Sequence, residues 1–228
     1  MATAKVKTNN AETLVDFVYA EIKKDLVRGY FKPGQKLIFR ELAERYSVSE
    51  TPVKQALNRL VSEQLVITIP QCGMRIQSST QEDFKDTMTI RYVLESYFAP
   101  VVLATVSFRG DVLQQMQRSI DLQREAVEHI EDVDSFIEYY QLDHEFHRMY
   151  AKCAKNKAMV QVLESMGTHA FSNYLFGKRT KEQFAASIHI HERILDALKE
   201  QDLDALQEAL HAHMEDGKSC IEYIHLDL

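Results

Sequence analysis

The sequence predicts a mainly α-helical protein made of two domains, a small one of three helices with a β-hairpin and a larger bundle of about six helices. Apolar residues recur at helical spacing along most of the chain. Two short apolar runs around a glycine-containing turn follow the third helix, which is typical of a hairpin. Glycine and proline become scarce after residue 81. We therefore expect domains at residues 10–77 and 81–222.

Composition favours a protein of the cytoplasm. No apolar run is long enough to span a bilayer, and the N-terminus MATAKVKTNNAET lacks the apolar core of a signal peptide. The three cysteines are scattered, so no disulfide framework is expected. Residues 1–75 carry 12 Lys and Arg against 8 Asp and Glu, whereas residues 76–228 carry 15 against 26. A basic small half and an acidic larger half indicate a polyanion-binding module joined to a separate sensor or partner domain.

Three helices are expected before the hairpin. Residues 12–28 place Val15, Val18, Ile22 and Leu26 on one stripe, and Gly29 ends the segment. A second helix is expected over residues 39–46. Ser49 can cap the third helix, in whose first turn Pro52 is tolerated because amide hydrogens there have no partner within the helix.

The hairpin is expected from residues 65–69 and 74–76, with Gly73 in the turn between them. Three helices and a hairpin are the layout of a winged helix-turn-helix, whose third helix lies in the major groove of DNA. Lys54 offers a charge to a phosphate or guanine, Thr51 suits a phosphate or a thymine methyl, and Gln55 can pair with adenine. The candidate DNA contacts are Arg40, Ser49, Glu50, Thr51, Lys54, Gln55, Asn58 and Gly73.

The stretch KPGQKLIFRELAERYSVSETPVKQALNRLVSEQLVITIPQCGMRI resembles the DNA-binding domain of the GntR family of bacterial regulators. The resemblance covers about 60 residues, and its TPV-K-x-AL segment is specific. Two residues depart from the family pattern, Glu50 in place of arginine and Gln64 in place of glycine. A glutamate in the groove repels phosphate but accepts a hydrogen bond from cytosine N4, so it points to an altered operator sequence.

The second half is expected to be helical, with breaks near residues 109–110, 131–132, 155–156, 177–178 and 201–202. Ser79 and Glu82 have the spacing of a capping box at the start of its first helix.

Helical phase selects four metal-ligand candidates among nine histidines and their acidic neighbours: Asp143, His147, His191 and His213. Asp143 shares an aromatic, inward-facing stripe, where a carboxylate is costly unless it is paired or bound to a cation. The neighbouring His144, His189 and His211 fall on other faces. Such a set suits zinc above all, and also nickel, iron, manganese or cobalt. The alternative is buried histidines that bond to backbone or carboxylate groups.

The run D-x-x-x-H at 143–147, the segment HERILDAL from 191 and A-L-x-x-H ending at 213 resemble the FCD effector domain found in the FadR-like branch of the same family. The resemblance implies that the same four residues bind the metal. It also implies effector-binding roles for Arg91 and Asn156, although Arg91 could instead pair with Glu95 on its own helix.

These features predict a homodimeric transcription regulator, not an enzyme, that binds a palindromic operator and responds to a small carboxylic acid bound at the metal. A purely structural metal is one alternative. A metal-dependent hydrolase is another, because three histidines and a carboxylate can activate water, but no general base or nucleophile motif accompanies them. The third is a protein-interaction adaptor with a degenerate winged helix.

Overall fold

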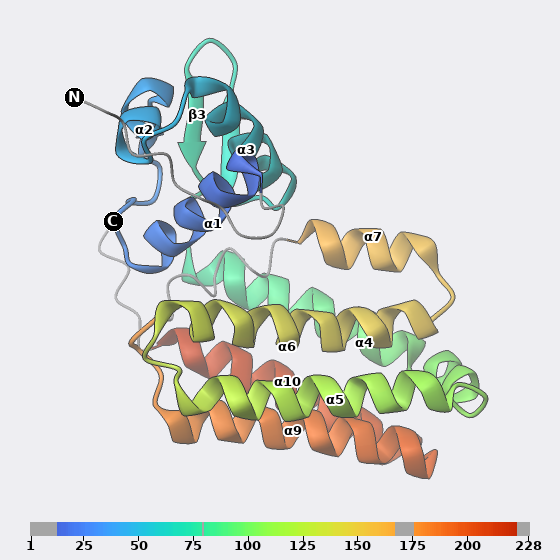
Figure 1. Ribbon diagram of the computed structural model, residues 1–228. Helices are drawn as coiled ribbons and strands as arrows, with labels where there is room; N and C mark the ends of the chain where they lie inside the picture. Colours follow the sequence, from blue (N-terminus) through green and yellow to red (C-terminus); the bar gives the residue numbers. More distant parts are fainter. Residues whose placement is uncertain (1–12, 79, 167–175, 223–228) are drawn as a thin grey trace. The chain divides into compact units, whose positions relative to one another are not determined.

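A computed structural model describes residues 13–78, 80–166 and 176–222 of the chain (Figure 1). They fall into two compact units that divide between Gln77 and Ser78, and each unit is considered by itself.

The first unit contains three helices and a three-stranded antiparallel sheet of order β1-β3-β2. Its elements are α1 (Leu14–Val27), β1 (Lys36–Leu37), α2 (Phe39–Arg45), α3 (Glu50–Ser62), β2 (Val66–Ile69) and β3 (Gly73–Ile76). The helices and the hairpin agree with the sequence prediction of a winged helix-turn-helix. The two-residue strand β1, which pairs Lys36 with Arg75, was not predicted because so short a strand shows no alternating pattern.

A buried carboxylate ties the first two helices together. Asp25 of α1 accepts hydrogen bonds from Arg45 Nε at 2.7 Å and from the Tyr46 hydroxyl at 2.8 Å. Val18 and Ile22 of α1 are fully buried, as is Leu57 of α3, against which α1 packs. The buried face of α3 packs against this core, and its opposite face is exposed to solvent.

Two predicted caps differ in detail. Ser49 is the N-cap residue of α3, but its side chain makes no capping hydrogen bond. The capping box of the bundle lies one residue later than predicted: Thr80 accepts from the Asp83 amide at 3.1 Å, and the Asp83 carboxylate accepts from the Thr80 amide. The predicted cap Ser79 lies outside the described residues. Two acceptable cap residues in succession cannot be separated by sequence pattern alone.

In its described part the second unit contains six helices, with breaks where the sequence predicts them. They are α4 (Gln81–Val106), α5 (Gly110–Glu128), α6 (Val133–Cys153), α7 (Lys157–Ser165), α9 (Lys181–Glu200) and α10 (Leu203–Glu222). Side-chain oxygens of Asp132, Asn156 and Thr180 accept amide hydrogens at the starts of α6, α7 and α9, where no carbonyl of the same helix can do so.

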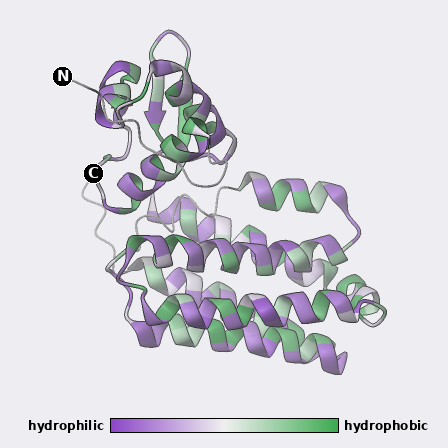
Figure 2. Cartoon of the chain, viewed as in Figure 1, coloured by the Kyte–Doolittle hydropathy of each residue, from purple (hydrophilic) through white to green (hydrophobic). Residues whose placement is uncertain are grey.

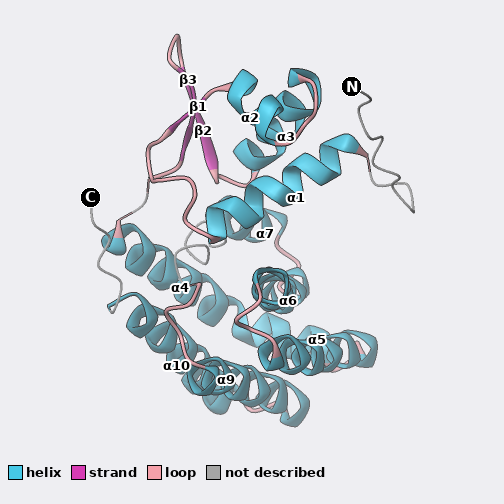
Figure 3. Cartoon of the chain, turned by 60° about the vertical axis from the view of Figure 1, so that its left-hand side comes forward, coloured by secondary structure: helices cyan, strands magenta, loops and turns pink. Residues whose placement is uncertain are grey.

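Five of these helices form a closed ring. α4 packs on α6, α6 on α5, α5 on α9, α9 on α10, and α10 again on α4, while α7 packs on the outside of α6. The view along α6 in Figure 3 shows the arrangement. Green apolar and purple polar segments alternate along the helices in Figure 2, as expected when one face of each helix is buried. The ring therefore has an enclosed interior to which every one of its helices contributes.

Within the described ranges, no helix combines the length and the apolar character that a membrane span requires.

Candidate metal centre

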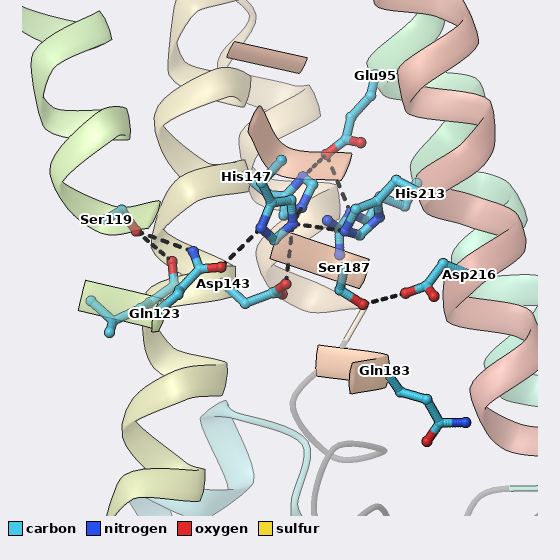
Figure 4. Close-up of polar contacts among 12 residues, drawn as sticks. Glu95, Ser119, Gln123, Asp143, His147, Gln183, Ser187, His213 and Asp216 are labelled. Carbon is cyan, nitrogen blue, oxygen red and sulfur yellow. Dashed lines mark hydrogen bonds and ion pairs between the residues drawn. The ribbon is translucent and has the colours of Figure 1, made fainter. Parts of the chain in front are cut away.

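The interior of the ring brings together all four metal-ligand candidates (Figure 4). Asp143 and His147 come from α6, His191 from α9 and His213 from α10. Their candidate donor atoms all lie within 4.8 Å of one another. His191 Nε2 is 3.2 Å from His147 Nε2, 2.8 Å from His213 Nε2 and 3.3 Å from Asp143 Oδ1.

Helical phase explains why these side chains meet and their neighbours do not. His147, His191 and His213 are buried, with at most 8% of each residue exposed. His189 and His211, two positions before His191 and His213, are exposed, because a step of two residues turns a side chain to the other face of a helix. The sequence prediction of which histidines face inward agrees with the structure.

A chain of hydrogen bonds fixes the tautomer of His191. The Ser119 hydroxyl donates to the Leu142 carbonyl at 2.9 Å, so it accepts from Gln123 Nε2 at 3.4 Å. The Gln123 amide oxygen then faces His191 Nδ1 at 2.9 Å and can only accept from it. With its proton on Nδ1, His191 keeps a bare lone pair on Nε2.

His147 is held in the same way by Glu95 of α4. His147 Nδ1 lies 3.0 Å from Glu95 Oε1, and Arg91 Nε donates to the same oxygen at 3.3 Å. The Tyr150 hydroxyl donates to the Glu95 backbone carbonyl at 2.9 Å and fixes the position of that turn. Burial raises the pKa of the Glu95 carboxyl, and the neighbouring Arg91 guanidinium lowers it. In its ionised form the carboxylate accepts only, so it draws the imidazole proton to Nδ1 and leaves the His147 Nε2 lone pair in the cluster.

The three imidazoles are neutral. Burial lowers the pKa of His191 to about 3 and lowers the pKa values of His147 and His213 well below the ordinary value. Burial also raises the pKa of the Asp143 carboxyl. The unprotonated Nε2 atoms of His147 and His191 face each other at 3.2 Å and repel unless a cation lies between them. Ligand atoms of a zinc ion are separated by about 2.9–3.4 Å when each lies about 2.1 Å from the metal, and the observed distances are close to this spacing.

The arrangement thus has the ligands, the spacing and the supporting bonds of a metal site. Buried histidines satisfied by other groups, the alternative considered from the sequence, account for the Nδ1 atoms of His147 and His191 and for a hydrogen bond between His213 and His191, but not for the facing Nε2 lone pairs of His147 and His191. Oxygen and imidazole ligands suit zinc and the neighbouring divalent metals alike, and no feature of the cluster distinguishes among them.

The two predicted effector contacts differ in their surroundings. Arg91 pairs with Glu95, which is one of the two roles considered for it, and its Nη2 atom is buried without a hydrogen-bond partner in the described structure. Asn156 caps α7, because its side-chain oxygen accepts from the Met159 amide at 3.0 Å. Arg91 therefore retains a donor for a ligand next to the metal candidates, whereas the Asn156 oxygen is engaged in the helix cap.

Sequence reasoning did not assign supporting roles to Glu95 and Gln123. Each is a polar residue at a buried position of its helix, where the exposed fractions are 2% and 0%. A glutamine in phase with the buried Met116 and Ile120 of α5 is the signal that could have identified Gln123. Which histidine it holds depends on the packing of α5 against α9.

In the first unit, the predicted DNA-contacting residues of α3 share its solvent-exposed face. Glu50, Thr51, Lys54, Gln55 and Asn58 are exposed, and Lys54 Nζ lies 3.6 Å from Glu50 Oε2. Arg40, on α2, is exposed and pairs with Glu44 at 3.0 Å. Gly73 begins β3 at a φ of +88°, a conformation that favours glycine at the tip of the wing. The Arg59 guanidinium is turned away from this group and bonds to Asp16 of α1 at 2.6 Å.

Two family models match the chain, "Bacterial regulatory proteins, gntR family" over residues 14–76 and "FCD domain" over residues 86–216. The HTH-type transcriptional repressor RspR of Escherichia coli is 23% identical over 224 residues, covering 97% of this chain and 95% of its own. The gluconate operon transcriptional repressor of Bacillus licheniformis is 22% identical and covers 90% of this chain and 84% of its own.

Two solved structures have the same fold. Escherichia coli McbR/YncC aligns with a TM-score of 0.66 at 22% identity, covering 90% of this chain and 95% of its own. A GntR regulator from Rhodococcus sp. RHA1 aligns with a TM-score of 0.65 at 20% identity, covering 91% and 97%.

Replacing an inward histidine should remove metal, whereas replacing its outward neighbour should not. We expect His213→Ala to lower the metal content of purified protein, measured by elemental analysis, because one of four ligands is lost. His211→Ala, two residues away on the exposed face of α10, is the matched control and should keep the wild-type content. Equal effects of the two substitutions would contradict the assignment of faces.

The metal-free protein should lose stability as the pH falls below about 6.5. The unfolded chain binds protons at its histidines below that pH, whereas the folded chain keeps His147, His191 and His213 neutral because burial lowers their pKa values. Each contributes a slope of up to about 1.4 kcal/mol per pH unit between pH 6.5 and 5, measured by urea unfolding. His213→Ala should reduce this slope and His189→Ala should not. Asp143 and Glu95 act in the opposite direction at lower pH, because burial raises their pKa values and the folded state then binds their protons. An equal slope in wild type and His213→Ala would contradict the assignment to the buried imidazoles.

Proposed function

Because the chain belongs to the GntR family of bacterial regulatory proteins and carries an FCD domain, we propose that it is a metal-dependent transcription repressor that responds to a small carboxylic acid. That the chain is a transcription regulator and not an enzyme follows from the two family models and from the repressors that it resembles along most of its length. The metal, the acid and the dimer are the proposed parts.

The convergence of three Nε2 atoms and the Asp143 carboxylate carries the proposal of a bound metal. His147, His191, His213 and Asp143 would hold a divalent ion, zinc first among the possibilities and nickel, iron, manganese or cobalt after it. When bound, such an ion supplies a positive charge that a carboxylate can bind directly. Glu95 and Gln123 keep the imidazoles in the tautomer that a metal needs.

Two features support an acid as the ligand. The Asp143 side chain is 18% exposed, whereas that of His191 is fully buried, so the cluster is more open on its carboxylate side. Arg91 pairs with Glu95, and Glu95 in turn contacts His147 of the cluster. The Arg91 Nη2 atom has no hydrogen-bond partner in the described structure. A carboxylate bound at the metal and near Arg91 would receive the charge-assisted hydrogen bonds that this guanidinium can still donate.

DNA binding is proposed through the exposed face of α3 and the wing. Thr51, Gln55 and Asn58 offer hydrogen-bonding groups to base edges or phosphates, and Lys54 offers a charge. The ion pair with Glu50 holds the Lys54 side chain on one side of the helix, so it influences which groups of the DNA the ammonium group can contact. Because the operator lies on the chromosome, we place the protein in the cytoplasm.

The exposed face of α4 supports a homodimer. Ile90, Val93, Tyr97 and Val101 follow helical spacing along one stripe and are 48%, 51%, 76% and 42% exposed. Contiguous apolar stripes of this kind mark contact surfaces in soluble proteins. A second copy of the chain is the partner that a palindromic operator calls for, because two-fold symmetry in the protein matches two half-sites in the DNA.

An acid should change operator affinity only when the metal is present. In a gel shift with the DNA upstream of its own gene, we expect the metal-loaded protein to bind and a screen of small carboxylic acids to alter that binding. Chelation, or the substitution His213→Ala, should abolish the response to the acid. No specific shift under any of these conditions would refute the regulator mechanism, and unfolding on chelation without any acid response would indicate a structural metal.

Lys54→Ala should weaken operator binding and reduce its salt dependence. Removing one phosphate contact lowers the slope of log affinity against log salt concentration by about one. Arg59→Ala is the control, because Arg59 already bonds to Asp16 and should leave that slope unchanged. An unchanged slope in Lys54→Ala would remove Lys54 from the phosphate contacts.

A charge in the α4 stripe should dissociate the dimer. We expect wild type to sediment as a dimer and Val93→Glu to sediment as a monomer at micromolar concentration, since the glutamate would be buried without a partner. Val162→Glu, at a 43% exposed apolar position of α7, is the matched control and should stay dimeric. Monomeric wild type, or a dimeric Val93→Glu, would contradict this interface.

A further inference from the structure

A glutamate and a lysine form an ion pair on the exposed face of α3. Glu50 is the first residue of α3 and Lys54 follows one turn later, so the two side chains share one face of the helix. Lys54 Nζ lies 3.6 Å from Glu50 Oε2, and the two side chains are 52% and 49% exposed. The pair therefore lies on the face through which the contact with DNA is proposed.

The ammonium group of Lys54 is also held from the side of α2. Lys54 Nζ lies 5.2 Å from the centroid of the Phe39 ring, and a cation over an aromatic face is attracted by the ring. Phe39 is the first residue of α2, which packs against α3 (Figure 3). The positive charge therefore lies between a carboxylate on α3 and an aromatic ring on α2.

DNA can exchange the partners of this ion pair. An exposed pair of this kind contributes little free energy, because water screens the two charges and both side chains lose conformational freedom. The first helix of a helix-turn-helix crosses the DNA backbone, so an ammonium group on the α2 side of α3 is placed for a phosphate. A phosphate that takes Lys54 from Glu50 leaves the carboxylate without a partner and close to a polyanion that repels it.

The base pair in the groove decides whether the displaced carboxylate finds a new partner. A carboxylate only accepts hydrogen bonds, so it needs an amino group on the edge of a base. The cytosine N4 amino group has an acceptor, guanine O6, on one side only. The adenine N6 amino group lies between two acceptors, its own N7 and thymine O4, which repel a carboxylate. A C·G pair therefore suits Glu50 better than an A·T pair does.

We propose that Glu50 makes the phosphate contact of Lys54 conditional on a C·G pair in the operator. On such a site the ion pair exchanges partners, so that Glu50 accepts from cytosine N4 and Lys54 donates to a phosphate. On other DNA the carboxylate has no suitable donor, stays with Lys54 and competes with phosphate for it. Glu50 is thus a specificity-determining residue that lowers the affinity for DNA in general more than the affinity for the operator. This inference rests on the proposed binding of DNA by α3.

The matched control is a second acidic residue in the first turn of a helix. A carboxylate there is favoured by the partial positive charge at the helix start, so removing Glu50 also removes this local contribution to α3. Glu41 is exposed and lies in the first turn of α2. It comes two residues after Phe39 and so faces the other side of that helix. Glu41→Gln therefore removes the same charge from an equivalent position, but not from Lys54.

The experiment measures sequence selection with the zinc-loaded, full-length protein. Wild type, Glu50→Gln and Glu41→Gln each select binding sites from DNA duplexes of random sequence. We expect wild type and Glu41→Gln to select a common C·G pair that Glu50→Gln does not select. Replacing that pair by T·A should weaken the binding of wild type about tenfold and leave the binding of Glu50→Gln nearly unchanged, because only the carboxylate needs the cytosine amino group.

Affinity for a duplex of alternating dA and dT, which contains no cytosine, tests the competition for Lys54. Glu50→Gln should bind this duplex about two- to five-fold more tightly than wild type, because the amide does not compete with phosphate for the ammonium group. In a Lys54→Ala background the same substitution should have less than half of this effect on the logarithm of the affinity. The four proteins form a double-mutant cycle that measures the coupling of the two residues.

The outcomes separate this inference from the proposed function. If wild type selects no sequence, specific DNA binding by α3 is refuted, and the role of Glu50 with it. If wild type selects a sequence and Glu50→Gln selects the same one with the same discrimination, the role of Glu50 alone is refuted. Weaker binding of Glu50→Gln to the alternating duplex, or equal tightening with and without Lys54, would also refute it, since the carboxylate would then not compete for the lysine.

Discussion

The mutual orientation of three neutral imidazoles is the constraint on which the rest of the second unit depends. Two carry their proton on Nδ1 because an amide oxygen and a carboxylate on neighbouring helices accept it. Their Nε2 atoms and that of His213 lie at separations that suit ligands of one ion, and the facing lone pairs of His147 and His191 repel without a cation between them. Two of the four metal candidates, His147 and His191, are thus oriented by bonds from residues outside the group.

That constraint extends around the whole helical ring. α6, α9 and α10 supply the candidate ligands, α4 supplies Glu95, and α5 supplies Gln123, so each helix of the ring has a polar residue committed to the centre. A shift in the positions of these central side chains therefore also changes the packing of the five helices. An acid that binds there can alter operator affinity only if it binds one arrangement of the protein better than another, and a site built from all five helices has the contacts through which such a difference could arise.

The metal candidates illustrate how a binding site opposes stability. The facing Nε2 lone pairs of His147 and His191 are unfavourable unless a cation lies between them. Fully apolar side chains at these positions would give a more stable bundle. The surrounding aromatic core, in which Phe136, Phe146 and Phe184 are almost fully buried, offsets this cost and keeps the polar groups in place.

The sequence by itself determined the fold class, the order of the helices, the position of the hairpin and the four metal-ligand candidates. Helical phase was sufficient to select the inward histidines, because it fixes which of His189 and His191, or of His211 and His213, faces inward. It could not determine the strand β1, which exists only through pairing with Arg75 and Met74. The capping box at Thr80 in place of Ser79 was likewise a choice between adjacent residues with similar chemistry.

Only the tertiary structure decided which groups hold the imidazoles of His147 and His191. Glu95 and Gln123 are 52 and 68 residues away from the histidines that they hold, and Arg179 meets Asp216 across 37 residues. A helical period states which face a residue occupies, but not which helix lies opposite that face. Hydrogen bonding has a range of about 3 Å, so the partner of a buried polar group depends on the packing of the ring rather than on any local pattern.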